Sequence, residues 1–148
     1  MSRKIVYLQI AVIILVGFVT YINSVDGKFI WDDYGLVKNN LYIKDWSNIL
    51  KIITQNIGAG SSSSSNFYRP LQIMTYTIDY SYWGLNVIGY HFTNVLLHIM
   101  AALVVYWFVG IIFNYGAVSF IASLFFLVHP VHTEAVAYIS GRADSLAL

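Results

Sequence analysis

Apolar residues occur along this chain in three long runs, and one long polar and aromatic segment lies between the first two. The first run, residues 5–22, has no charged residue and as a helix would be about 27 Å long, enough to cross a bilayer core. The others are residues 90–113 and 117–139, separated by residues 114–116, which are typical of a tight turn. The pattern predicts three membrane helices, the last two forming an antiparallel hairpin.

The third run is less regular than the other two. From Ala117 to Val128 it spans twelve residues, roughly 18 Å of helix against a ~30 Å hydrocarbon core. The helix therefore either continues past Pro130 to about residue 139 or ends early. Arg142 and Asp144 then precede a further apolar run, so we expect three to four membrane helices and interpret the chain as the front part of a longer membrane protein.

The segment 24–89 predicts a long extramembrane loop that contains helices lying at the membrane interface. Asp45 is placed to cap a helix whose apolar residues recur at helical spacing, and Pro70 suits the first turn of another that runs toward Trp83 and Gly84. Residues 58–65 are rich in Gly and Ser, which favours a mobile loop.

The composition supports an all-α, multispanning membrane protein. Hydrophobic residues make up 58% of the 148 and charged residues only 10%, with 17% aromatic. The formal net charge of +1 provides no field to attract nucleic acid. Cysteine is absent, so no disulfide framework exists.

The charge at the N-terminus predicts the orientation in the bilayer. Arg3 and Lys4 precede the first apolar run and favour a cytoplasmic N-terminus, which places loop 24–89 outside or in the lumen. A cleavable signal peptide is the alternative, but no small-x-small cleavage site follows, so we interpret the run as a retained anchor.

Two adjacent acids, Asp32 and Asp33, follow the first membrane helix by about ten residues and are the candidate catalytic groups. A positioned carboxylate can accept the proton that a hydroxyl nucleophile loses. We expect Asp32 to be the base and Asp33 to orient the acceptor; a divalent cation is the one cofactor such a pair could hold. The alternative is a solvated turn flanked by aromatic residues.

Polar residues within the apolar runs provide further candidates. His91, Asn94 and His98 share one helical face, either positioning a substrate or hydrogen-bonding neighbouring helices. His129, His132 and Glu134 have a spacing that could ligate a metal, but Pro130 disturbs it. We therefore predict no metal site and assign these residues to substrate positioning or polar packing.

Four ordered motifs carry a resemblance to a known family. They are Trp31-Asp32-Asp33-Tyr34, Phe67-Tyr68-Arg69-Pro70-Leu71, the stretch from Gly89 to His98, and His129-Pro130-Val131-His132-Thr133-Glu134 with Gly141-Arg142-Ala143-Asp144. Together they resemble the N-terminal membrane region of the transmembrane and tetratricopeptide-repeat O-mannosyltransferase-like proteins, within the type C glycosyltransferase superfamily.

The resemblance implies an enzyme of the endoplasmic reticulum, or of a prokaryotic plasma membrane. It would transfer a sugar, expected to be mannose, from a polyprenyl-phosphate donor to protein Ser/Thr hydroxyls on the outer face, with Asp32 or Asp33 as base. Arg69 and Arg142 are the guanidiniums available to the departing phosphate, and a structural salt bridge is the alternative role for each of them. The resemblance also implies further membrane helices and tetratricopeptide repeats beyond residue 148, and we expect the 148-residue piece to be inactive alone.

Two functions of other classes remain open. One is a non-catalytic membrane scaffold that recruits proteins through the expected repeats. The other is a transporter that relays protons through His91, His98, His129 and Glu134, although the cytoplasmic halves of the predicted helices are apolar.

Overall fold

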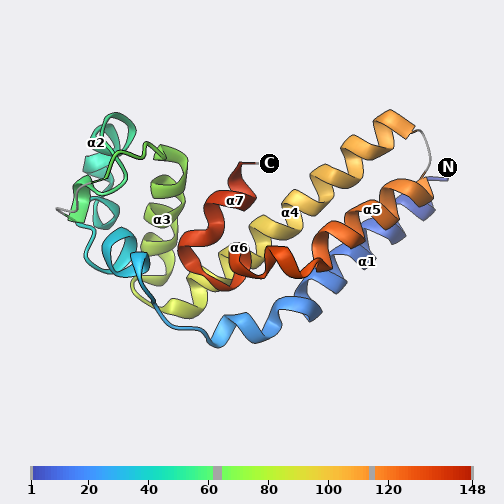
Figure 1. Ribbon diagram of the computed structural model, residues 1–148, viewed down its shortest axis with the longest axis horizontal. Helices are drawn as coiled ribbons and strands as arrows, with labels where there is room; N and C mark the ends of the chain where they lie inside the picture. The colour runs from blue at the N-terminus through green and yellow to red at the C-terminus, as the bar shows by residue number, and fades with distance from the viewer. Residues whose placement is uncertain (1, 62–64, 114–115, 148) are drawn as a thin grey trace.

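The computed structural model describes residues 2–61, 65–113 and 116–147, and this part of the chain is helical with no strand. The helices are α1 (Arg3–Tyr21), α2 (Ile49–Thr54), α3 (Pro70–Trp83), α4 (Val87–Phe113), α5 (Gly116–Val128), α6 (Thr133–Ala137) and α7 (Arg142–Leu146). Figure 1 shows α1, α4 and α5 on one side of the molecule and α2 and α3 on the other, with the short helices α6 and α7 between them.

Two segments are long and apolar enough to span a membrane, Arg3–Asp26 and Val87–Phe113. A third span is formed only if α5 and the segment Pro130–Ala137, which are bent by 49° from each other, are counted together. Of the two alternatives for residues 117–139, the structure has the early end of the helix, followed by a bent segment after Pro130. Helix α5 ends at Val128 because His129, which precedes a proline, is extended at φ −66° and ψ 129°. The predicted turn falls partly on residues 114–115, outside the described residues.

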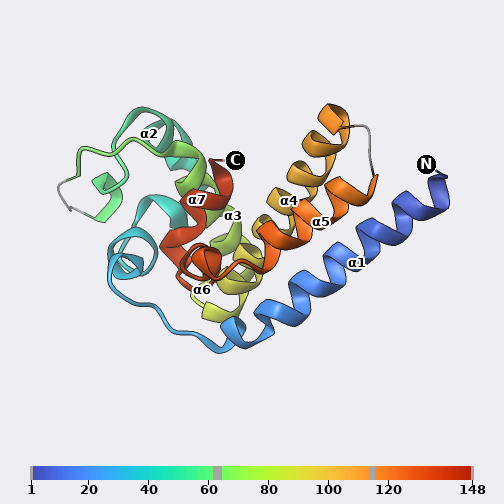
Figure 2. The same cartoon turned by 45° about the vertical axis from the view of Figure 1, so that its right-hand side comes forward.

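Helices α1, α4 and α5 pack along one another and enclose one core (Figure 1, Figure 2). Its centre includes Ile13, Ile99 and Leu127, which are almost completely buried. Gly17 allows the close crossing, since a Cβ there would lie 2.5 Å from Cγ1 of Ile99. The outer faces of these helices expose large apolar side chains, as expected of lipid-facing or helix-facing surfaces, including Leu8, Leu15, Val19, Met100, Trp107, Phe108, Ile111, Ile121 and Phe125.

The long loop folds around a second core beside the N-terminal part of α4. Val37, Ile43, Ile73 and Tyr76 are buried in it, and it also contains Ile52, Ile57, Tyr90 and Ile139. The loop lies at the end of the molecule opposite the N-terminus and the far ends of α4 and α5 (Figure 2). The N-terminus and the loop, which the predicted orientation assigns to opposite faces of the membrane, are therefore separated in space.

Local signals define the loop helices as predicted. The Asp45 carboxylate accepts the Ser47 N–H at 2.8 Å before α2, and Pro70 begins α3. Gly84 ends α3 with φ +58°, a left-handed conformation that favours glycine.

Residues 58–61 of the Gly- and Ser-rich stretch, which the sequence predicts to be mobile, adopt a defined turn. Residues Ala59–Ser61 form a 3₁₀ turn, and the Leu41 N–H donates to the Gly60 carbonyl at 2.8 Å. Ser62, Ser63 and Ser64, the centre of that stretch, lie outside the described residues.

Candidate active site

The two adjacent acids lie in very different surroundings. Asp33 is fully buried, and its Oδ1 accepts from the Ser140 N–H at 2.9 Å and from the Ser140 hydroxyl at 2.6 Å. Its Oδ2 accepts the Ile30 N–H at 3.0 Å. Burial raises the pKa of Asp33, and these hydrogen bonds oppose the rise. Asp33 thus ties the loop after α1 to the segment before α7.

Asp32, in contrast, is exposed at the surface. Its backbone N–H donates to the Tyr138 hydroxyl at 3.2 Å. The preceding residue, Trp31, has φ +44°, a backbone conformation that residues other than glycine rarely adopt. Tertiary contacts hold this strained residue, because the Trp31 ring packs edge-on against Tyr138 with centroids 6.0 Å apart. The loop therefore presents Asp32 to solvent while Asp33 anchors it.

Asp32 faces a cleft of about 570 Å³ that also contains Arg69. We call it the Asp32 cleft, and its wall combines aromatic and small residues from three parts of the chain: Trp31, Gly35, Leu36, Ile57, Gly58, Ser65 and Phe67. The Arg69 guanidinium lies over the Phe67 ring at 5.1 Å. An exposed carboxylate and an exposed guanidinium, predicted as base and phosphate ligand, thus share one cavity.

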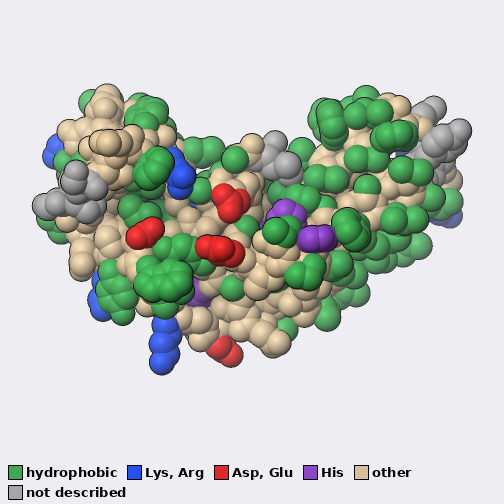
Figure 3. All heavy atoms as spheres, in the orientation of Figure 1, with side chains coloured by type: hydrophobic (Ala, Val, Ile, Leu, Met, Phe, Trp, Pro, Cys, Tyr) green, Lys and Arg blue, Asp and Glu red, His purple; other side chains and the backbone are tan. Residues whose placement is uncertain are grey.

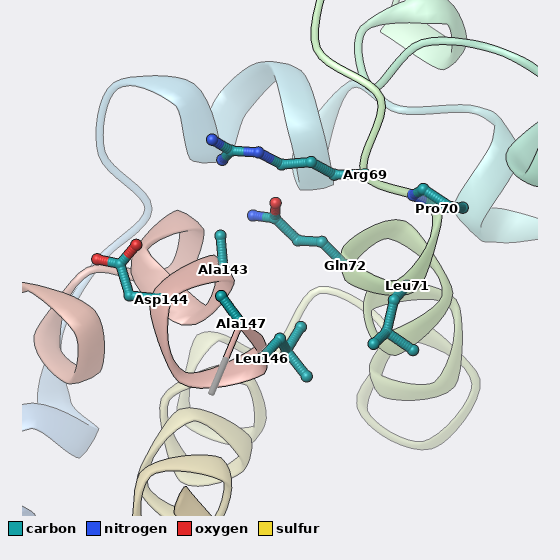
Figure 4. Close-up of a pocket in the computed structure, with 8 residues that line it drawn as sticks. All are labelled: Arg69, Pro70, Leu71, Gln72, Ala143, Asp144, Leu146 and Ala147. Atoms are coloured by element: carbon teal, nitrogen blue, oxygen red, sulfur yellow. The ribbon is translucent and has the colours of Figure 1, made fainter.

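Arg69 also lines an adjoining pocket of about 290 Å³ between the start of α3 and α7. Figure 4 shows its guanidinium above Ala143, with the Gln72 amide on one side of Ala143 and Asp144 on the other. Asp144 is not among the residues that the sequence pattern predicts for the site. Its place in the Gly141-Arg142-Ala143-Asp144 motif is the signal that could have found it.

Arg142, predicted to bind the donor phosphate, has other partners. Its side chain is fully buried, and its Nη1 donates to the Asp79 carboxylate at 2.6 Å and to the Thr75 hydroxyl at 3.1 Å. Its Nε donates to the Asn94 amide oxygen at 2.9 Å, and its Nη2 to the Tyr90 carbonyl at 3.1 Å. These bonds use four of the five guanidinium donors. A phosphate would have to displace them, so we keep Arg69 alone as the phosphate candidate.

Burial governs the ionisation of the groups around Arg142. It raises the pKa of Asp79, while the guanidinium opposes that rise. Burial also raises the pKa of Tyr76 to about 12. The Tyr76 ring lies under the guanidinium at 4.4 Å, so the cation is held between a carboxylate and an aromatic face.

The polar face of α4 binds neighbouring helices. The Asn94 amide donates to the carbonyls of Tyr138 at 2.9 Å and Val136 at 3.2 Å, and the His98 ring lies 3.2 Å from the Leu127 carbonyl. The side chains of Asn94 and His98 are buried. Of the two predicted roles for this face, their contacts match hydrogen bonding to neighbouring segments. His91 is also buried, and neither ring nitrogen has a hydrogen-bond partner among the described residues.

The remaining candidates occupy the segment between α5 and α7. Glu134 is exposed and lines a cleft of about 540 Å³ together with Trp31. His132 lines a smaller pocket of about 220 Å³ together with Asp144, and its ring lies 6.2 Å from that of His129. Acidic and histidine side chains gather near the middle of the face in Figure 3. Within the described ranges, no group of three or more His, Asp or Glu residues could hold a metal ion.

The fold and this site define an α-helical integral membrane protein with a polar site beside its helix bundle. Comparison with known proteins identifies relatives of this chain. The chain is 35% identical to "Protein O-mannosyl-transferase F38B6.6" of Caenorhabditis elegans over 144 residues, covering 93% of this chain. It is 36% identical to the O-mannosyl-transferases TMTC1 of Mus musculus and TMTC2 of Homo sapiens, each over 86% of this chain.

These relatives confirm the resemblance: the chain is related to the transmembrane and tetratricopeptide-repeat O-mannosyltransferase-like family over most of its length. The chain spans 14–21% of the length of these three proteins. No family model matches the chain. No solved structure matches it either.

Proposed function

We propose that the protein containing this chain transfers mannose from a polyprenyl-phosphate donor to Ser/Thr hydroxyls of an acceptor protein. The main support for this proposal is that an exposed acid, Asp32, and an exposed guanidinium, that of Arg69, line one cleft. The names of the relatives, which describe protein O-mannosyl-transferases, support the reaction class. The remaining membrane helices and the tetratricopeptide repeats are expected outside this chain.

In this reaction the Asp32 carboxylate accepts the proton of the attacking hydroxyl. The hydroxyl oxygen forms a bond to the anomeric carbon, and the bond from that carbon to the phosphate oxygen breaks with inversion. The electron pair leaves with the lipid phosphate, whose negative charge Arg69 stabilises through bidentate hydrogen bonds. Asp33 acts through the backbone, because its bonds to Ser140 and Ile30 hold the loop on which Asp32 lies.

The same proposal places the cleft on the lumenal side of the endoplasmic reticulum membrane. The cleft is lined by residues of the loop, and Figure 2 shows the loop at the end of the molecule opposite the N-terminus. Arg3 and Lys4 are the third and fourth residues from that terminus. A positively charged terminus favours the cytoplasmic side, so the cleft would face the lumen. A polyprenyl-phosphate donor could then enter from the membrane with its headgroup beside Arg69.

The test uses the full-length protein in nanodiscs with a radiolabelled polyprenyl-phosphate mannose and a Ser/Thr peptide. We expect Asp32→Asn to lower kcat by about a hundredfold or more, the usual contribution of a general base, while donor Kd is unchanged. Arg69→Ala should raise donor Kd about tenfold or more, because a charge-assisted contact is lost.

Asp26→Asn is the matched control, since Asp26 is an exposed acid that ends the turn after α1 and lines none of the four pockets described above. It should behave as wild type. Transfer that survives Asp32→Asn would refute the assignment of the base. Absence of donor binding by folded wild-type protein would instead favour the scaffold function.

A further inference from the structure

Trp31 lines both the Asp32 cleft and a second large cavity, which we call the Glu134 cleft. Its side chain is 78% exposed, and its ring contacts that of Tyr138, which also lines the Glu134 cleft. The Glu134 cleft is otherwise formed by the segment that follows α5, through Pro130, Val131, Thr133, Ala137 and Tyr138, with Ile30.

The two cavities differ in charge. Arg69 and Asp32 both line the Asp32 cleft, so that cleft offers a cation to an anionic group. Glu134 is the charged residue among those that line the second cleft, and no Lys or Arg is among them. In the first cleft the Arg69 guanidinium attracts a phosphodiester and the Asp32 carboxylate partly offsets that attraction, whereas in the second cleft Glu134 repels it. The Glu134 cleft therefore suits a neutral or basic ligand.

The acid that acts in the proposed reaction lines the Asp32 cleft, and two of its contacts belong to residues of the Glu134 cleft. Asp32 follows Trp31 directly, and its N–H is held by the hydroxyl of Tyr138, which lines the Glu134 cleft. In-line displacement with inversion requires the nucleophile and the leaving group on opposite faces of the anomeric carbon. The acceptor therefore needs a binding site distinct from the one that holds the donor phosphate, and the Glu134 cleft is a second cavity beside the loop that carries Asp32.

We propose that the Glu134 cleft binds the acceptor polypeptide, and that Glu134 selects a segment with a basic residue beside the target Ser or Thr. The inference rests on the proposed function, since it names the acceptor site of the same reaction. The volume of about 540 Å³ is in the usual range for a ligand cavity. Trp31 and Tyr138 provide aromatic surface, and the exposed Thr133 hydroxyl and Glu134 carboxylate provide polar contacts to a peptide.

The experiment measures KM for two peptides that differ only beside the target Thr, one carrying Arg and the other Glu. Full-length wild type in nanodiscs should have the lower KM for the Arg peptide. Glu134→Lys should have the lower KM for the Glu peptide, and the ratio of the two KM values should change by roughly fivefold or more. Donor Kd should stay within twofold of wild type. Asp26→Lys, the same charge change at an exposed acid outside both clefts, should leave the preference unchanged.

An unchanged peptide preference in Glu134→Lys would overturn the inference. A change of donor Kd in this variant, with the peptide preference intact, would overturn it too, because the cleft would then hold part of the donor lipid. Failure of the proposed function is distinguishable, since wild type would then show no transfer to either peptide. Binding of the fluorescent peptides, measured by anisotropy, would still report whether Glu134 selects the basic one.

Discussion

Replacing Arg142 by alanine distinguishes the role that the sequence predicts from the role that its contacts indicate. The substitution leaves the Asp79 carboxylate, which is 2% exposed, without the guanidinium 2.6 Å away. It also removes the hydrogen bonds to Thr75, Asn94 and the Tyr90 carbonyl. Removing one partner of a buried ion pair typically costs about 3–5 kcal/mol, and we expect a loss of this size.

The loss should depend on pH. Without the guanidinium, burial is opposed only by the hydrogen bond from the Thr93 hydroxyl among the causes that act on Asp79, so its folded pKa rises further above the unfolded value. A group with a raised folded pKa contributes stability that is present at low pH and is lost as the pH rises through that pKa. The deficit of Arg142→Ala relative to wild type should therefore be larger at neutral pH than at acid pH.

The assay is thermal unfolding of the full-length protein in detergent, at neutral and acid pH, together with donor binding. A lower Tm at neutral pH that partly recovers at acid pH is the expected result. Asp79→Leu combined with Arg142→Met should recover much of the loss, because the pair is then replaced by apolar groups. An Arg142→Ala protein as stable as wild type but defective in donor binding would refute our reasoning and restore Arg142 as a phosphate ligand.

Two further substitutions test the packing of Ser140 and Gly141, the two residues just before α7. Gly141→Ala should cost about 1–3 kcal/mol, because its Cβ would lie 2.4 Å from the Glu134 carbonyl oxygen, a backbone atom that cannot easily move. The control is Gly35→Ala, whose nearest neighbouring atom is 3.7 Å away, and equal Tm values for both variants would contradict the packing argument. Ser140→Ala should cost about 1.5–3 kcal/mol at neutral pH, because a donor 2.6 Å from the buried Asp33 is lost. That bond lowers the Asp33 pKa against burial, so without it the folded pKa rises and the penalty should shrink as the pH falls; equal penalties at neutral and acid pH would argue against the role of this bond.

Local sequence was sufficient for most of the helices. The long apolar runs predicted α1 and α4 because a membrane helix must satisfy its own backbone hydrogen bonds. Pro70 and Gly84 marked the two ends of α3 through their effects on φ. The break at His129 was one of two alternatives that the sequence left open, since a proline can either kink a helix or end it.

The candidate site was predictable as a set of residues but not in its arrangement. The motif containing Asp32 and Asp33 was visible, and so was Arg69. Periodicity could place Asn94 on a polar face, but it could not tell that this face binds carbonyls of the segment before α7. The sequence also gave no reason to separate Arg69 from Arg142, because both are arginines on the same predicted side.

The sequence by itself determined the membrane class, the order of the helices and the family relationship, because these follow from composition, periodicity and motifs read along the chain. Tertiary structure decided which acid is exposed and which arginine is free to meet a ligand. Asp33 is bonded to Ser140 across 107 positions, and Arg142 to Asp79 across 63. Burial and pairing at such separations depend on how the helices pack, and two neighbouring acids of identical chemistry acquire different roles only when that packing buries one of them.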